Sequence, residues 1–339
     1  MTLSHHTTAD SLAPTHDEFP QSDSLASVLR HVGDTGYRFT TTTPLTHQRL
    51  LDYRGGEPGT TLRDVFGWNL PFLAGAVPPE LLDLMTHAGI LVRRGAFLKS
   101  TLRIASLDDL LFTHSAFPTT DQAAVFFGPD TYRFVRFVQS HLPAVISHAN
   151  TDVPLRLLDI GCGSGAGGIA VARALRRAGL VVDATLNDIN QIALDTSALN
   201  AQHAGVSVNL ALGDALDSVA GDFDLIIANP PFLDDAQQRA YRHGGAGLGR
   251  ALSVRFAADA LARLAPGGRL LLYTGVAMLD GTDPFLAELT PLLAAAGCEG
   301  SYQEIDPDIF GDELSRPIYA HVDRIAAVGL VATRRRVAV

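Results

Sequence analysis

Short apolar runs alternate with segments of helical periodicity along the second half of the chain. Strand-like runs are expected at residues 155–160, 181–186, 207–212, 223–227 and 269–274. Amphipathic helices are expected between or after them, at 168–177, 254–264 and 285–296. Two further strand-like runs, at 302–305 and 326–332, come last and predict an antiparallel closing pair. Alternating strands and helices predict an α/β fold with a doubly wound, mainly parallel sheet.

The first half of the chain carries a different pattern. Short helices are expected at 25–32, 45–53 and 80–87, the last ending at Gly89. Strands at 90–93 and 97–104, separated by Arg94-Gly95-Ala96, predict a hairpin after the third helix. A helix followed by a hairpin resembles a winged-helix or helix-plus-ribbon module, so a mainly helical accessory domain is predicted. Residues 1–22 are rich in Ser, Thr, His and Asp without periodicity, and we expect a disordered leader there.

A glycine-rich turn follows the first apolar run of the second half. It reads Asp159-Ile160-Gly161-Cys162-Gly163-Ser164-Gly165 and leads into a helical segment. Gly161, Gly163 and Gly165 permit positive φ, and the helix start offers free N–H groups to a nucleotide-like ligand. The dinucleotide spacing G-x-G-x-x-G would place Ala166 at its last glycine.

Later strands end in further polar residues. Asp188-Ile189 follows the second strand, and Asp214-Ala215 follows the third. In doubly wound sheets such carboxyl ends meet at a ligand crevice, where Asp188 would hold ribose hydroxyls and Asp214 an adenine amino group. The alternatives are a helix N-cap at Asp188 and a surface turn at Asp214.

The fourth strand ends in Asn229-Pro230-Pro231-Phe232. With the acidic residue and glycines of the first turn, this motif resembles the class I S-adenosylmethionine-dependent methyltransferases. Within them it is similar to the "methyltransferase small" domain family, which includes release-factor glutamine and adenine or guanine N-methyltransferases. The resemblance implies a Rossmann-like seven-stranded sheet, S-adenosyl-L-methionine as cofactor, and a nitrogen as the methyl acceptor.

The motif suits a nitrogen whose lone pair is delocalised. Asn229 Oδ1 and the Pro230 carbonyl can accept hydrogen bonds from its two N–H groups. These bonds turn the lone pair of the nitrogen toward the methyl group of the donor. Pro231 stiffens the turn, and Phe232 can stack on a planar substrate. The alternative is a turn that merely ends the strand.

Two flanking segments complete the predicted site. Residues 233–249 are polar and glycine-rich, so Tyr241, Arg242 and His243 are predicted to contact substrate, against the alternative of a solvated loop. Residues 126–134 lead into an amphipathic helix that resembles the helix covering the methionine end of the donor. Thr131 and Tyr132 are therefore predicted to line the cofactor site with Asp130, whose alternative role is a helix cap. The predicted domains are the leader at 1–22, a substrate-recognition domain at 23–125, a bridging helix at 126–150 and an S-adenosylmethionine-binding catalytic domain at 151–339.

Composition and net charge limit the classes of partner that the chain is expected to bind. The 339 residues are 47% apolar with a formal net charge of −10, which disfavours a polyanionic partner. Arg93, Arg94, Lys99 and Arg103 form the one basic cluster expected on the hairpin. No run is long enough to span a bilayer and no signal pattern is present, so a cytoplasmic location without membrane contact is predicted. The two cysteines, Cys162 and Cys298, are not expected to form a disulfide, and no metal site is predicted.

These patterns predict an S-adenosylmethionine-dependent N-methyltransferase. The leading acceptor is a planar or cationic nitrogen, namely an amide, guanidino or amino group, of a protein side chain or small metabolite. The alternatives are methylation of an RNA or DNA base, at adenine N6 or guanine N2, and a methyltransferase-like binding module without turnover.

Overall fold

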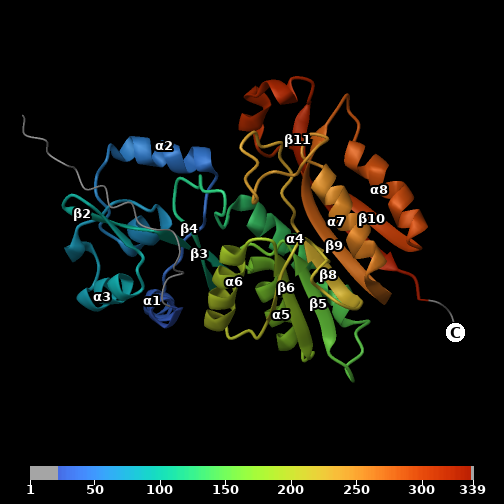
Figure 1. Ribbon diagram of the computed structural model, residues 1–339, viewed down its shortest axis with the longest axis horizontal. Helices are drawn as coiled ribbons and strands as arrows, with labels where there is room; N and C mark the ends of the chain where they lie inside the picture. Colours follow the sequence, from blue (N-terminus) through green and yellow to red (C-terminus); the bar gives the residue numbers. More distant parts are fainter. Residues whose placement is uncertain (1–21, 337–339) are drawn as a thin grey trace, which may run out of the picture.

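The computed structural model describes residues 22–336, and the leader expected at 1–22 lies outside this range except for its last residue. Figure 1 shows a smaller amino-terminal part, coloured blue to teal, beside a larger part built on one central sheet. Within the described range, no helix combines the length and apolar character needed to cross a membrane.

The amino-terminal part contains three helices and two hairpins. Its helices are α1 (Ser22–Asp34), α2 (Pro44–Arg54) and α3 (Pro79–His87), with a π-helical turn at Arg63–Gly67 and a 3-10 turn at Ala74–Ala76. Its hairpins are β1 (Leu91–Arg94) with β2 (Phe97–Ser100), and β3 (Leu102–Leu107) with β4 (Leu110–Ser115). The predicted helical region is present, and a hairpin follows its third helix.

The single strand expected at 97–104 is wrong, because the chain breaks it at residue 101. Ser100 Oγ donates to the Leu102 carbonyl and accepts from the Leu102 N–H, so the backbone folds on itself between β2 and β3. The second hairpin that follows was not expected from the sequence. Its strands are buried along nearly their whole length and lack the alternation of a half-exposed ribbon.

The larger part is a seven-stranded sheet in the order β10-β11-β9-β8-β5-β6-β7. Strands β5 to β9 pair in parallel, while β11 is antiparallel to both β9 and β10. The strands are β5 (Leu155–Ile160), β6 (Val182–Asp188), β7 (Asn209–Leu212), β8 (Phe223–Ala228), β9 (Leu264–Met278), β10 (Cys298–Asp306) and β11 (Arg324–Arg334). The predicted Rossmann-like sheet, with its antiparallel closing pair, is confirmed.

Helices cover both faces of this sheet. They are α4 (Pro129–Ile146), α5 (Ala166–Arg177), α6 (Gln191–His203), α7 (Ala251–Ala262) and α8 (Pro284–Ala295). Leu157 of β5 joins a core with α4, α5 and α6, whereas the next residue, Leu158, joins a core with α7 and α8. Side chains of successive strand residues point to opposite faces, so a continuous apolar run serves both cores.

One boundary differs from the sequence prediction. Pro266-Gly267-Gly268 was expected to separate a helix from the strand at 269–274, but β9 begins at Leu264 and includes these residues. The pairing of β8 with β9 shifts register after Phe223, and a Cβ at residue 268 would lie 2.6 Å from the Phe223 carbonyl oxygen. The turn residues therefore form an irregular start to the strand.

The second hairpin connects the two parts of the molecule. Ile104 and Leu111 pack into the amino-terminal core, while Ala105 and Phe112 pack into the core shared with α4 and α5. The side chain of Asn200 on α6 accepts from Thr113 N–H at 2.8 Å and donates to the Ser164 carbonyl at 2.9 Å. Apolar packing and buried polar contacts thus hold the amino-terminal part against the sheet domain.

Candidate active site

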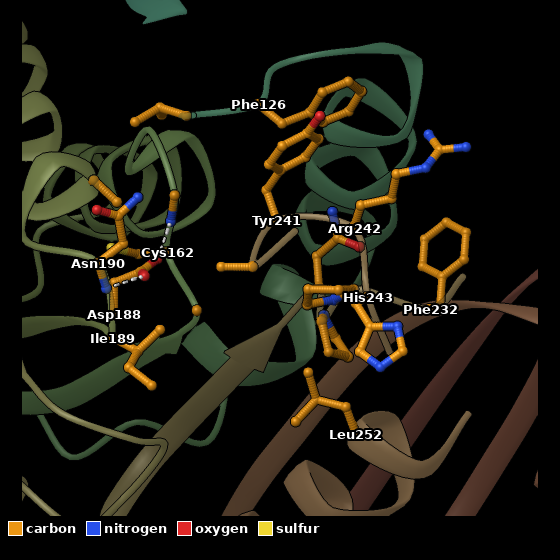
Figure 2. Close-up of a pocket in the computed structure, with 18 of the residues that line it drawn as sticks. Phe126, Cys162, Asp188, Ile189, Asn190, Phe232, Tyr241, Arg242, His243 and Leu252 are labelled. Atoms are coloured by element: carbon orange, nitrogen blue, oxygen red, sulfur yellow. Dashed lines mark hydrogen bonds between the residues drawn. The ribbon is translucent and has the colours of Figure 1, made fainter. Parts of the chain in front are cut away.

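A cavity of about 390 Å³ opens at the carboxyl ends of β5, β6, β7 and β8. Figure 2 shows its two sides: Cys162 and Asp188 to Asn190 on one, and Phe232 and Tyr241 to His243 on the other. After β5 the chain adds β6 and β7 on one side of the sheet and then β8 and β9 on the other. The cavity lies at this reversal of strand order, which is where doubly wound sheets bind ligands.

The glycine turn after β5 forms the floor of the cavity. Gly161 and Gly163 line it with φ of +67° and +55°, values that side chains rarely adopt. Gly165 also has positive φ, but it does not line the cavity: a Cβ there would lie 2.9 Å from Ser197 Oγ. It serves the packing of the turn against α6, which differs from its predicted contact with cofactor.

Asp159 is buried beneath the turn at 2% exposure. Its Oδ2 accepts a hydrogen bond of 2.7 Å from the Gly168 N–H in the first turn of α5. Burial, with a smaller contribution from the charge of Asp188, raises the pKa of this carboxyl to about 7 against the opposing effect of that hydrogen bond. Asp159 therefore fixes the helix start against the strand end.

The Asp188 side chain links the glycine turn to the start of α6. Its Oδ2 accepts from Gly163 N–H and its Oδ1 from Asn190 N–H, each at 2.9 Å. Burial raises the pKa of Asp188. The cap of α6 is Asn190 and not Asp188, since the Asn190 side chain accepts from Ile192 N–H. Each carboxylate oxygen keeps a lone pair for a hydroxyl donor.

Asp214 lines the cavity from the end of β7 but is already paired. Arg255 of α7 holds both of its oxygens, at 2.6 and 2.8 Å, and this pairing lowers the pKa of Asp214. Ala215 lies beside it at the cavity wall. Any further donor would share the carboxylate with this guanidinium.

Asn229 and Pro230 line the cavity, and neither the Asn229 side chain nor the Pro230 carbonyl makes a hydrogen bond to another residue in 22–336. Polar groups at a cavity wall without protein partners are available to a ligand. This arrangement agrees with their predicted role as acceptors of substrate N–H groups.

Phe232 sits at the cavity edge with 8% exposure. Its ring lies directly over Gly275 of β9, where a Cβ would approach ring atoms to 2.4 Å, and it meets Phe310 edge-on at 5.6 Å. The ring is thus fixed by β9 and by the segment between β10 and β11. Pro231 lines the same wall.

The segment after β8 is irregular, as predicted, and it is tied down. Asp235 pairs with Arg239 at 2.6 Å, and Arg242 pairs with Glu313. Gly249 approaches the Phe232 carbonyl so closely that a Cβ would lie 2.2 Å from its oxygen. The segment therefore forms a fixed wall, from which Tyr241, Arg242 and His243 reach the cavity.

Helix α4 brings Asp130 and Thr131 to the cavity, but not Tyr132. The Tyr132 hydroxyl accepts from the Thr41 N–H at 3.0 Å and so faces the amino-terminal part. Asp130 does not cap the helix; it accepts a 2.6 Å hydrogen bond from the Tyr273 hydroxyl, and burial raises its pKa. Adjacent helical positions point about 100° apart, which explains why Thr131 and Tyr132 diverge.

The basic cluster expected on the first hairpin does not form. Arg93 and Arg94 are exposed on β1, but Lys99 donates to the Phe117 carbonyl and Arg103 is only 3% exposed on β3. The break at residue 101 turns Arg103 into the interior.

Several lining residues were missed by the sequence prediction. Asn190 follows a predicted strand end and Phe126 begins the predicted segment 126–134, so both lay within reach of a sequence signal. Phe310 comes from an irregular segment whose sequence gives none. The remaining lining residues that were not predicted include Ala124, Asn187, Gln238, Leu252, Arg255 and Phe256.

Together, the switch-point cavity, the glycine turn and the strand-end carboxylates define a nucleotide-cofactor site of a doubly wound α/β protein. Residues 143–278 match the family model described as Methyltransferase small domain. This match confirms the resemblance predicted from the sequence: the region is similar to methyltransferase small domains of the class I fold, and S-adenosyl-L-methionine is the cofactor that the match supports.

Relatives match over part of their length. A release factor glutamine methyltransferase of Deinococcus radiodurans is 33% identical over 171 residues, covering 47% of this chain and 55% of that protein. A ribosomal RNA small subunit methyltransferase C of Hahella chejuensis is 35% identical over 117 residues, covering 34% of this chain and 30% of that protein. The chain thus spans about half, or less, of these curated relatives. A solved methyltransferase from Pyrococcus furiosus is 17% identical with a TM-score of 0.37, covering 57% of this chain and 82% of that chain.

Proposed function

We propose that the chain is an S-adenosylmethionine-dependent N-methyltransferase acting on a protein side chain or a small molecule. The proposal is supported by two acceptors, Asn229 Oδ1 and the Pro230 carbonyl, which have no hydrogen-bond partner among residues 22–336 and belong to residues that line the cavity above the glycine turn.

The donor would be held by groups from four strand ends. Gly161 and Gly163 allow close approach of backbone to the methionine part, and Asp188 would accept the ribose hydroxyls. Ile189 and Ala215 offer apolar surface to the adenine, and Asp214 would accept from its amino group while paired with Arg255. Asp130 and Thr131 would cover the methionine end, and Asn229 would contact the donor from the acceptor side.

The acceptor would be oriented beside the donor. When bound, S-adenosyl-L-methionine supplies an electrophilic methyl group. Asn229 and Pro230 would hold the two N–H bonds of the acceptor so that its lone pair faces that methyl, with Pro231 fixing the carbonyl. Phe232, Tyr241, Arg242 and His243 would enclose the plane that carries the nitrogen. The fixed wall after β8 makes this site preorganised.

Methylation of RNA is the second candidate, because a ribosomal RNA methyltransferase is among the relatives. Charge favours the first candidate: the chain carries −10 overall, and Arg103, one of the four residues of the basic cluster expected on the first hairpin, is buried. The predicted cytoplasmic location stays a prediction.

Transfer of a labelled methyl group into fractionated lysate tests the acceptor class. We expect incorporated label to survive nuclease and to be released by protease or recovered among small molecules. Label that is lost on nuclease treatment alone would establish the nucleic-acid alternative instead.

A further inference from the structure

A second cavity, of about 260 Å³, lies between the amino-terminal part and the wall after β8. We call it the side cavity; its lining includes Thr41, Thr42, His47, Arg103, Phe117 and Thr119. It shares Phe126, Tyr241 and Arg242 with the first cavity, at the strand ends, which we call the donor cavity. Figure 2 shows the rings of Phe126 and Tyr241 side by side, and they stack at 5.9 Å between centroids. The two cavities therefore share one aromatic wall.

Arg103 is the most unusual group in the side cavity. It is 3% exposed, and no carboxylate within residues 22–336 lies within 4.0 Å of its guanidinium. Its Nε donates to the Ser115 carbonyl at 3.0 Å, and one terminal nitrogen donates to Thr119 Oγ1 at 3.4 Å. Burial lowers the pKa of Arg103 to about 10, which leaves it charged at neutral pH. A buried, unpaired guanidinium is costly and calls for a partner.

Neighbouring polar groups also lack partners. Thr41 Oγ1, Thr42 Oγ1 and His47 Nδ1 are buried and make no hydrogen bond to any residue that the structure describes. The His47 ring stacks on Phe117 at 4.0 Å, and burial together with the charge of Arg103 lowers the pKa of His47 to about 4. The imidazole is thus neutral at pH 7 and adds no charge. Hydroxyl groups beside a guanidinium provide donors for an oxyanion.

The charge balance limits what the side cavity accepts. Arg239 is paired with Asp235, and Arg242 with Glu313. Three guanidinium groups line the cavity. Arg239 and Arg242 each have a carboxylate partner, although Glu313 also pairs with Arg316, whereas Arg103 has none among residues 22–336. A guanidinium without a carboxylate partner in a small cavity suits a single negative charge, and a guanidinium pairs with a carboxylate through two parallel N–H···O bonds.

We propose that the side cavity binds a carboxylate of the methyl acceptor, with Arg103 as its ion-pair partner and Thr41 and Thr42 as hydrogen-bond donors. The proposal rests on the proposed function, because it places the remainder of that acceptor along Phe126 and Tyr241 toward Asn229. The acceptor class is therefore a carboxylate-bearing molecule with a planar nitrogen group, such as an amino acid derivative or peptide.

Binding of three planar probes tests this site without needing turnover. Benzoate, benzamide and benzamidinium share one shape and carry charges of −1, 0 and +1. They are titrated into the full chain, saturated with S-adenosylhomocysteine, and followed by ligand-observed NMR. We expect benzoate to bind at least about tenfold more tightly than benzamide, and benzamidinium not to bind. Equal binding of benzoate and benzamide would overturn the proposal.

Variants locate the binding. Arg103→Met is expected to weaken benzoate binding at least about tenfold, while Arg93→Met, on the exposed edge of β1, leaves it unchanged. Because loss of buried Arg103 affects packing, Thr42→Val provides a second test. This near-isosteric change removes a hydroxyl without a protein partner, so folding is retained and benzoate binding falls several-fold. Unchanged benzoate affinity in Thr42→Val and in folded Arg103→Met would refute the assignment.

The outcome is separable from the proposed function. If S-adenosylhomocysteine binds and benzoate does not, only the carboxylate site is lost. If benzoate binds and S-adenosylhomocysteine does not, the methyltransferase proposal fails while the side cavity stands.

Discussion

At the scale of single residues, the donor cavity depends on carboxylates held by backbone N–H groups. Asp159 and Asp188 both accept such bonds, the first from the start of α5 and the second from the glycine turn and the start of α6. Both residues line the cavity, but Asp159 is only 2% exposed, beneath the turn. Asp159 therefore holds the turn against α5, and Asp188 presents its oxygen atoms to a ligand.

Replacing Asp188 by Asn tests that distinction. The amide would turn a donor toward either Gly163 N–H or Asn190 N–H, and it would lose charge-assisted acceptance of ribose hydroxyls. We expect binding of S-adenosylhomocysteine, measured by calorimetry, to weaken by about 10- to 100-fold. The matched control is Asp183→Asn on the same strand, where an exposed carboxylate accepts a side-chain hydrogen bond from Asn209 and from no other described side chain. Equal affinities in the two variants would contradict the role of Asp188.

The raised pKa of Asp159 predicts a pH dependence of stability. The folded state holds this proton up to about pH 7, whereas an unfolded Asp loses it near 3.8. Between these values the folded state binds more protons, so its stability falls as pH rises, by at most about 1.4 kcal/mol per pH unit. Urea unfolding of wild type and Asp159→Asn from pH 4 to 8 isolates this effect. A stability difference between the two proteins that is constant over this range would refute it.

Residue positions were predictable where a strand end fixed them. Asp159, Asp188 and Asn229 follow apolar runs, and parallel strands bring their carboxyl ends together. Tyr132 and Arg103 were not predictable, because the direction of each depends on packing against a distant segment. Arg103 points inward only because the chain turns at residue 101.

At the scale of elements, β9 determines how the Asn229 to Phe232 motif is held. Gly275 leaves the space that the Phe232 ring fills, so the strand and the motif fit face to face. The ring then forms a fixed edge of the cavity, and β9 acts on the site without contributing a side chain at that point.

Gly275→Ala tests this contact. Its Cβ would meet the Phe232 ring at 2.4 Å and force the ring toward the cavity. We expect a loss of about 1–3 kcal/mol in unfolding free energy, together with reduced methyl transfer. Gly75→Ala is the control, since nothing lies within 4 Å of a Cβ there. The double change Gly275→Ala with Phe232→Leu should recover part of the stability; no recovery would show that the ring is not the obstacle.

The central strands were predicted because buried parallel strands read as continuous apolar runs, as in 155–160 and 223–228. The β3–β4 hairpin was missed for a related reason. Both of its faces are buried, between two cores, so its sequence shows no alternation that would separate it from neighbouring segments. Only the three-dimensional arrangement reveals which core each side chain joins.

At the scale of the whole molecule, the amino-terminal part and the sheet domain share buried contacts. Asn200 of α6 is fully buried and bonds to both Thr113 and Ser164. The side cavity lies at the same boundary. If the two parts are one folding unit, the acceptor site proposed between them is stable without a partner.

Unfolding followed by two probes tests whether the two parts form one folding unit. The single tryptophan, Trp68, reports on the amino-terminal part, while far-ultraviolet circular dichroism reports mainly on the sheet and its helices. We expect coincident urea transitions, and Asn200→Ala should lower both by about 2–4 kcal/mol by leaving buried groups without partners. Asn209→Ala, at the exposed edge of β7, should change little. Separate transitions in the wild type would contradict a single unit.

The central claim is that the Asn229 motif transfers a methyl group to nitrogen. The most direct measurement compares wild type with Asn229→Ala, using calorimetry for S-adenosylhomocysteine and single-turnover transfer of ¹³C-methyl into the protein and small-molecule fractions of lysate. We predict N-methyl carbon signals from wild type, and in the variant donor-product binding within about threefold but transfer at least about 100-fold slower. Unchanged transfer in the variant, or label found only on carbon, oxygen or sulfur, would contradict the account.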